Sequence, residues 1–269
     1  MIKKKQIAAL VLAGTMAMGS SMQAFACMGV YVGKEVSENG SSYIGRSEDI
    51  GVGHTKIFTV HPAEDHEPGA IFEDAYGFSM PYPEHTYQYT LAKDSPLFGE
   101  GEEPYAEVGI NENEVAMTAT VSTYYNDKAK AADPLVDTGI CELSMGSILL
   151  GQAKTARDGV ELLGESLSIE PSEDGVYGPY DLLFTPNKKF STQDIMKFLA
   201  YRGEGTKMDS NVNESIYAIG NKNQAECHIL EMRNGMYQGM SGVEWLAMSR
   251  AEFSLYLPYY GRSEERRVG

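Results

Sequence analysis

The sequence lacks an apolar run long enough to cross a membrane. Its most apolar stretch, Ile7 to Met18, is interrupted by Gly14 and is shorter than the ~20 residues that a transmembrane helix needs. Basic residues are also scarce, since 22 Lys and Arg stand against 38 Asp and Glu and give a net charge of −16. Because phosphate groups repel an acidic surface, we expect no nucleic-acid partner and no anionic-membrane partner.

Cysteine is equally sparse, at positions 27, 141 and 227. At least one of the three must be unpaired. Either Cys141 and Cys227 form a disulfide and leave Cys27 as the odd thiol, or both are small core hydrophobes. Cys and His are not clustered at the spacing of metal ligands, so no metal and no other cofactor is predicted.

The first 26 residues have the three parts of a secretory signal peptide. Lys3 to Lys5 form a positive region, Ile7 to Met18 form the apolar region, and Ala24 to Ala26 fit the small-x-small cleavage pattern. We therefore predict cleavage before Cys27 and a secreted or cell-envelope location, with no membrane association after the cut. A lipoprotein signal is the alternative, but it normally has Leu three residues before the Cys, where Ala24 stands here.

Loss of the three lysines with this segment lowers the net charge to −19. Residues 27–261 are long enough to bury one sizeable core and are predicted to form one domain. Residues 262–269 form a charged, arginine-dense tail, which is either a solvated end or the end of an incomplete reading frame. The sequence does not indicate the oligomeric state.

A β-hairpin is predicted immediately after the cleavage site. Met28 to Gly33 is rich in β-formers, Asn39-Gly40 supplies a turn, and Ser42 to Ser47 reads as the returning strand. Because a hairpin brings its two ends together, Cys27 is expected close to the segment Arg46 to Asp49.

Helices are predicted in the middle of the chain and strands on either side. His54 to Glu103 is polar, Pro-rich and aromatic, which is typical of a looped excursion with a few strands, and Val115 to Ser122 reads as a core strand. Helical periodicity over Glu142 to Leu167 puts Leu149, Ala153, Ala156, Val160 and Leu163 on one face. A second helix over Ser191 to Tyr201 begins with a capping box formed by Ser191 and Asp194, and its apolar residues are Ile195, Phe198 and Leu199.

Four further strands are predicted at Ser215–Gly220, Cys227–Met232, Val243–Met248 and Phe253–Pro258. This order of elements predicts an α+β sandwich.

Cys27 is the candidate nucleophile. A thiol at a chain's N-terminus has the α-amine beside it, whose pKa of about 7.7–8.0 lets it accept the thiol proton near neutral pH. Arg46 would stabilise the thiolate or hold a substrate carboxylate, and Asp49 would orient the α-ammonium. The alternatives are an inert residue after a signal cut and an ordinary surface ion pair between Arg46 and Asp49.

The stretch from Cys27 to Gly51, CMGVYVGKEVSENGSSYIGRSEDIG, resembles the start of the bacterial dipeptidase A family. GINENEVAMTAT (Gly109 to Thr120), ADPLV, AKTARDGVELL, GEGT and ECHILEMR resemble later parts of it in the same order. These are cysteine peptidases of the N-terminal-nucleophile hydrolase superfamily, related to choloylglycine and penicillin V acylases. The resemblance implies an αββα sandwich, Cys27 as nucleophile, Arg46 and Asp49 beside it, and dipeptides or small amides as substrates.

Members of this family are longer, with more core strands and an oxyanion-hole Asn between the two helical regions. Pro171 to Lys189 contains no equivalent, and Asn187 follows no apolar strand, so the sandwich is expected to be incomplete through an internal deletion. Asn111 and Thr120 lie in a matching motif without an assigned role. A secreted cysteine dipeptidase is the leading hypothesis, and an inactive or binding-only remnant and an amide acylase are the alternatives.

Overall fold

The computed structural model describes residues 27–51, 54–97, 105–120, 127–132, 139–140, 142–167, 186–213, 218–235 and 240–262. The predicted signal segment, Cys141, the charged tail beyond Arg262 and most of the break between the two helical regions lie outside these residues. No helix in the described part of the chain is both long enough and apolar enough to span a bilayer.

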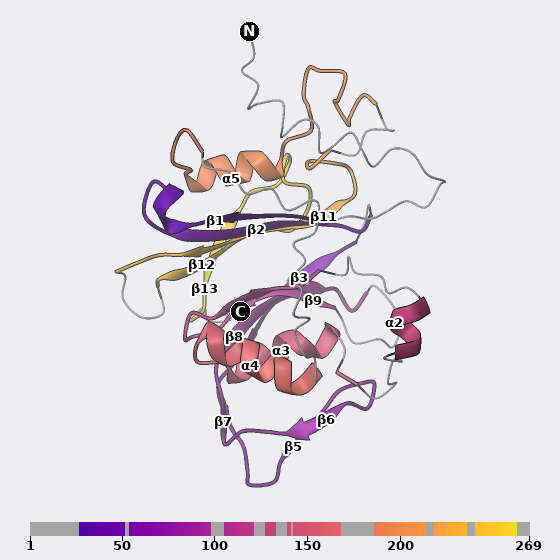
Figure 1. The fold of residues 1–269 in the computed structure, drawn as a ribbon, viewed down its shortest axis with the longest axis vertical. Helices are drawn as coiled ribbons and strands as arrows, with labels where there is room; N and C mark the ends of the chain where they lie inside the picture. Colours follow the sequence, from indigo (N-terminus) through magenta and orange to yellow (C-terminus); the bar gives the residue numbers. More distant parts are fainter. Residues whose placement is uncertain are drawn as a thin grey trace, which may run out of the picture.

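Two antiparallel sheets face each other at the centre of the molecule (Figure 1). Within the described residues, the larger sheet has the order β1 (Met28–Val32), β2 (Ser42–Asp49), β11 (Gln224–Met232), β12 (Gly242–Ala247) and β13 (Leu257–Tyr260). The smaller sheet has the order β10 (Ala116–Thr118), β9 (Ala106–Ile110), β8 (Tyr89–Asp94) and β3 (Lys56–His61).

Helices cover the two outer faces of this pair of sheets. The helix α5 (Thr192–Leu199) contacts β2 and β11 of the larger sheet, and α3 (Glu142–Gln152) contacts β8, β9 and β10 of the smaller one, with α4 (Ala156–Leu167) packed against α3. The order of layers in Figure 1 is therefore helix, sheet, sheet, helix. The shorter elements are η1 (Lys34–Val36), β4 (Glu64–Asp65), β5 (Ile71–Glu73), β6 (Ser79–Pro81), β7 (His85–Thr86) and α2 (Asp127–Ala132).

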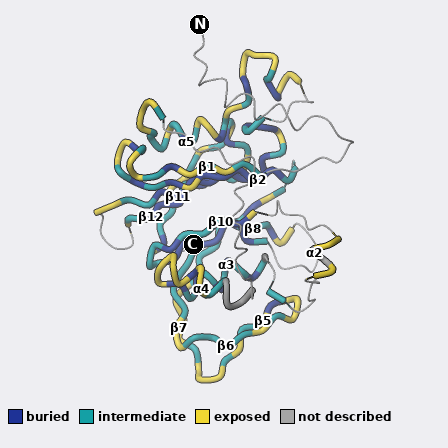
Figure 2. Tube along the Cα trace, viewed as in Figure 1, coloured by how far each residue is buried: buried dark blue, intermediate teal, exposed yellow. Residues whose placement is uncertain are grey.

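Apolar side chains fill all three spaces between the layers, and burial is deepest along the central strands (Figure 2). Ile195 and Leu199 of α5 pack with Ile229 on the outer face of the larger sheet. Leu230 and Val108 meet between the two sheets. Ile229 and Leu230 are adjacent on β11, so they show the alternation of faces that a strand buried on both sides requires.

The same alternation governs β2. A Cβ atom at Gly45 would lie 3.1 Å from Ile195 Cγ2, so Gly45 allows α5 to approach the sheet closely. The neighbouring residues of β2 face the other way, and Glu48 reaches Lys56 of the smaller sheet. Arg46 shares this inner face with Glu48 because the two residues are two positions apart.

Several predicted elements are confirmed. The strands β1 and β2 pair antiparallel as the hairpin required, and Gly40 has a positive φ of 73° in the turn between them. The predicted capping box is present at α5, where Ser191 accepts from the Asp194 N–H and the Asp194 carboxylate accepts from the Ser191 N–H. The strands β11 and β12 also lie where the sequence predicted them.

The prediction of a looped excursion with a few strands over His54 to Glu103 is confirmed where the structure describes this segment. This segment supplies β3 and β8, two strands of the smaller sheet, as well as the short hairpins. The polar and aromatic composition did not indicate that these two strands belong to a core sheet, because both carry charged side chains, such as Lys56, into the space between the sheets.

The helical region is also divided differently. The predicted face of Glu142 to Leu167 assumed a continuous period, but α3 ends at Gln152 and α4 starts at Ala156. Asp158, in the first turn of α4, accepts from the N–H groups of Lys154 and Thr155, and its own N–H donates to Thr155 Oγ1, so this pair caps the new helix. Val160, predicted to face the core, is 65% exposed.

Three strand predictions need correction. Residues 121–122 of the predicted strand Val115 to Ser122 lie outside the described residues, and the rest of it shortens to β10. Phe253 to Pro258 is replaced by β13, which starts at Leu257. Within Ser215 to Gly220, residues 215–217 lie outside the described residues, and the remainder is not a strand.

Candidate active site

The hairpin β1–β2 brings Cys27 and Arg46 into contact. Gly29 pairs with Arg46 and Met28 with Ser47, so Cys27 lies at the start of β1 beside the end of β2. Arg46 Nη2 lies 3.3 Å from Cys27 Sγ and donates a hydrogen bond to it. The thiol is half-buried and not in a disulfide, whereas the arginine is only 5% exposed.

The guanidinium of Arg46 is held as a cation. Burial lowers the pKa of Arg46, but the electrostatic interactions with Cys27, Glu226 and Glu107 and the hydrogen bond to Cys27 outweigh burial and raise the pKa above its usual value. Arg46 Nε and Nη1 are buried and have no hydrogen-bond partner among the described residues. A permanent cation therefore contacts the thiol sulfur and retains two further donors.

Asp49 lies at the same end of β2 but on the opposite face from Arg46, because the two are three positions apart on a strand. Its carboxylate is fully buried and accepts from Asn221 Nδ2 at 3.2 Å. The structure thus brings Cys27 and Arg46 together directly. It places Asp49 at the same end of the sheet with Asn221, and the role of Asp49 towards the α-amine stays a prediction.

A buried cluster of charges lies next to Arg46, between the two sheets. Lys56 Nζ contacts the carboxylates of Glu48, Asp94 and Glu107, with the Asp94 oxygen at 2.5 Å. Burial and then the charge of Glu48 raise the pKa of Glu107 well above its usual value. The three carboxylates have the spacing of metal ligands, but the ammonium of Lys56 already takes the position of a cation among them.

A second group on the same face joins the two sheets. His228 of β11 lies 2.9 Å and 3.0 Å from the two carboxylate oxygens of Glu226 through Nδ1, and 2.8 Å from Thr118 Oγ1 of β10 through Nε2. Glu226 and His228 are both fully buried. The structure thus places His228 between the two sheets.

Glu48, Lys56, Glu107, Glu226 and His228 were not singled out as site residues. The alternation in the segment ECHILE puts Glu226 and His228 on one face, which was the available signal. Nothing local to Lys56 or Glu107 indicated that they would meet.

The other residues considered in the sequence, Asn111, Thr120 and Asn187, lie at a helix end or at the surface. Asn111 is fully buried, and its Nδ2 donates to the carbonyls of Leu150 and Ala153 at the end of α3, so it fixes that helix to the smaller sheet. Thr120 and Asn187 are exposed. These positions give none of the three an oxyanion-hole role.

Cys227 and the histidines of the short hairpins have other partners and surroundings in the described part of the chain. Cys227 is a free thiol, fully buried on the α5 face of β11, and burial raises its pKa well above the usual value. This confirms the interpretation of Cys227 as a core residue. His66 and His85 lie in the short hairpins, where they pair with Thr86 and Asp65.

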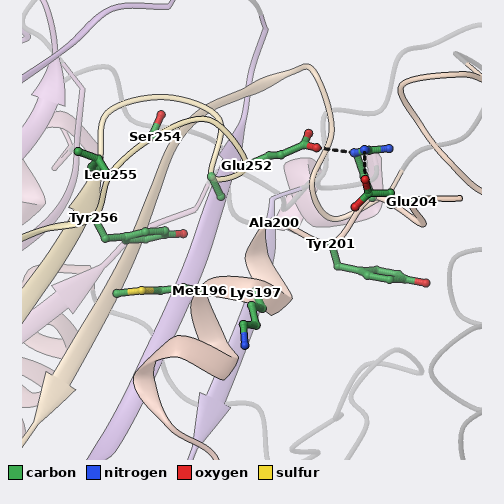
Figure 3. A pocket seen from close by; sticks show the side chains of 11 residues that line it. Met196, Lys197, Ala200, Tyr201, Glu204, Glu252, Ser254, Leu255 and Tyr256 are labelled. Atoms are coloured by element: carbon green, nitrogen blue, oxygen red, sulfur yellow. Dashed lines mark hydrogen bonds and ion pairs between the residues drawn. The ribbon is translucent and has the colours of Figure 1, made fainter.

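A cavity of about 590 Å³ lies on the outer side of the larger sheet, between the end of α5 and the loop before β13 (Figure 3). Met196, Ala200, Leu255 and Tyr256 line it, and Arg202 and Glu252 form an ion pair at its edge. Neither Cys27 nor Arg46 lines this cavity, so it is separate from the contact between thiol and guanidinium.

With this geometry in place, comparisons identify the class of protein. The sequence model of peptidase family C69 matches residues 26–184 and 173–268, and the chain belongs to this family. The predicted resemblance to the dipeptidase A family is thereby confirmed.

Curated relatives agree. The chain is 39% identical over 177 residues to a "Probable dipeptidase B" of Streptococcus pyogenes serotype M3, covering 65% of this chain and 34% of that protein. It is 38% identical over 151 residues to a "Probable dipeptidase" of Latilactobacillus sakei, covering 56% and 31%. It is 35% identical over 167 residues to a "Probable dipeptidase A" of Streptococcus pyogenes serotype M1, covering 61% and 33%. The matched part thus spans about a third of each of these relatives.

Proposed function

We propose that the chain is an exported cysteine dipeptidase whose nucleophile becomes the N-terminal residue when the chain is cut before Cys27. The observation that carries this proposal is the hydrogen bond of 3.3 Å from Arg46 Nη2 to Cys27 Sγ, within a chain of a peptidase family. A buried guanidinium favours the thiolate over the thiol, and the thiolate is the nucleophilic form of cysteine.

The proposed reaction needs no cofactor. The α-amine of Cys27 accepts the thiol proton, and Sγ bonds to the carbonyl carbon of the dipeptide. The resulting oxyanion collapses, the C–N bond breaks, and the leaving amine takes the proton from the α-ammonium. Water then attacks the thioester and gives its proton to the α-amine. Release of the amino acid regenerates the thiol.

Arg46 and Asp49 are proposed to divide the charges of this site. Arg46 stabilises the thiolate and can offer its remaining donors to a carboxylate of the substrate. Asp49, buried at the same end of β2, is proposed to orient the α-ammonium, with Asn221 fixing the carboxylate.

The fold and the relatives support the same proposal. The order helix, sheet, sheet, helix is that of the N-terminal-nucleophile hydrolase sandwich, to which we assign the chain. The printed names of the relatives suggest a dipeptide as the substrate. Export rests on the predicted signal peptide before Cys27.

One observation favours a second candidate, a non-catalytic remnant of the family. The family model matches in two stretches that overlap at residues 173–184, which is the pattern that an internal deletion would give. Such a protein would keep the hairpin and the contact between Cys27 and Arg46 without turning over substrate.

Two measurements on material from the culture medium separate these candidates. Intact mass and N-terminal sequencing should show a chain that starts at Cys27 with a free amine. That material should hydrolyse dipeptides, Cys27→Ala should not, and Cys27→Ser should retain at most a trace because a hydroxyl is much harder to deprotonate. A different or lipid-modified start would exclude the amine-base mechanism, and a correct start without hydrolysis would favour the remnant.

A further inference from the structure

His228 is fully buried between the two sheets, and both of its ring nitrogens are engaged. Nδ1 faces both oxygens of Glu226, at 2.9 Å and 3.0 Å, and Nε2 lies 2.8 Å from Thr118 Oγ1. Since Thr118 belongs to β10 and His228 to β11, the imidazole ties the two sheets together. The residue that holds Glu226 is therefore itself fixed by Thr118 from the other sheet.

The strand register places this group beside Arg46. His228 lies directly opposite Arg46 in the pairing of β11 with β2, and Glu226 lies directly opposite Glu48. Opposite residues of an antiparallel pair have Cβ atoms about 4.5–5.5 Å apart. The negative charge of Glu226 is among the groups that raise the pKa of Arg46. A carboxylate and a guanidinium are thus neighbours in a buried layer.

Two anions compete for one guanidinium in this arrangement. A carboxylate forms a two-pronged pair with Arg, which is stronger than a single bond to sulfur. Arg46 nevertheless bonds to Cys27, while its Nε and Nη1 have no partner among the described residues. The two oxygens of Glu226 are turned to His228 instead.

We propose that His228 is a positioning residue that, anchored by Thr118, holds the carboxylate of Glu226 so that Arg46 remains on the sulfur of Cys27. This rests on the proposed function only in treating the thiol as a nucleophile. On the other side of Arg46, Lys56 holds Glu48 and Glu107 in the same way. Arg46 is therefore flanked by acids that already have partners, and Glu244 of β12, a further buried acid, accepts from Thr90 of the smaller sheet.

Alkylation of Cys27 by iodoacetamide, followed by peptide-level mass spectrometry across pH, tests this proposal. His228→Leu should free Glu226 to pair with Arg46, lower the alkylation rate at pH 7 about tenfold and raise the pH midpoint by about one unit. Glu226→Gln alone should stay within about twofold of the wild type. The double variant Glu226→Gln/His228→Leu should recover most of the lost rate, because the competing anion is gone.

A merely structural role predicts that the double variant is at least as slow as His228→Leu, and that result would overturn the proposal. An unchanged rate in His228→Leu would do the same. Tyr43→Phe is the matched control, since it removes a buried hydrogen bond at the far end of the same strands and should leave alkylation unchanged.

Thr118→Val provides a second test if His228→Leu does not fold. It removes the anchor of His228 with little change of volume and should slow alkylation in a manner that Glu226→Gln reverses. No change in Thr118→Val would count against the proposal. Alkylation does not require turnover, so a His228-dependent thiol without dipeptide hydrolysis would support this inference while contradicting the proposed peptidase activity.

Discussion

The strand β11 carries a buried glutamate near each end, and the two have opposite surroundings. The carboxylate of Glu231 accepts hydrogen bonds from five donors: Asn39 Nδ2, Ser41 Oγ, Tyr43 OH, Trp245 Nε1 and Arg233 Nη2. Burial alone would raise the pKa of Glu231, but the bonds from Arg233 and Trp245 outweigh burial and lower it. Glu226 instead faces His228 and lies among other acids.

The acids near Glu226 show the cost of this crowding. Burial, followed by the charge of Glu226, raises the pKa of Glu244 to about 8. The pKa of Glu107 is raised as well. A buried carboxylate with enough donors stabilises a fold, whereas buried acids close together destabilise it. Perturbed acids beside a nucleophile candidate are typical of functional sites. The end of β11 with Glu231 thus stabilises the sheet, whereas the crowded acids at the end with Glu226, near Cys27, destabilise it.

The same substitution at both ends should separate these roles most strongly. Glu231→Gln would turn an amide NH₂ group towards donors such as Trp245 Nε1, and we expect a loss of about 3 kcal/mol in the free energy of unfolding. Glu226→Gln should change it by less than about 1 kcal/mol, because it removes one of several crowded charges. Urea unfolding of both variants measures the difference. Equal losses would show that the two ends do not differ in this way.

Arg46 should give the next largest effect, on reactivity and not on stability. Arg46→Ala should slow Cys27 alkylation at pH 7 about a hundredfold, equivalent to about 2.7 kcal/mol. Arg46→Lys should recover only part of the rate, since a point charge does not reproduce a planar fork. Full recovery by lysine would show that charge alone is sufficient. The same kinetics on Glu231→Gln, which should match the wild type, provide the control.

Glu244 should give the smallest effect, and it depends on pH. Because its folded pKa of about 8 lies above its unfolded value, the folded state keeps a proton that the unfolded state releases, and stability falls as pH rises from about 4.5 to 8. Glu244→Gln should therefore gain on the order of 2 kcal/mol over the wild type between pH 5 and pH 7.5.

Urea unfolding at the two pH values measures this gain. Glu231→Gln should show the opposite trend, because the lowered pKa of Glu231 contributes stability that is lost as pH falls through the folded value. Its deficit relative to the wild type should shrink in acid. Parallel pH profiles for the two variants would contradict the contrast between the ends of β11.

The parts of the site that depend on local sequence could be predicted. The hairpin followed from β-formers around Asn39-Gly40, and the contact between Cys27 and Arg46 followed from the hairpin. The start of α5 followed from the spacing of Ser191 and Asp194. In each case the information lies within about twenty residues.

The parts that depend on packing of the two sheets could not be predicted. Lys56 meets acids from β2, β8 and β9. Because these residues are far apart in the sequence, each of them looks like an ordinary surface charge. His228 and Thr118 likewise meet from strands of different sheets. Alternation along β11 gave the shared face of Glu226 and His228, but nothing in the sequence identified that face as the inner one.

The register of β1 has a consequence for the order of events in the life of the chain. Among the described residues, pairing of β1 with β2 runs from Met28 to Val32, so these pairs all lie after Cys27. Removing the residues before Cys27 leaves all of these pairs in the chain. Folding and maturation are then separable in time: we expect the hairpin to close and Arg46 to reach the sulfur whether or not the peptide bond before Cys27 has been cut.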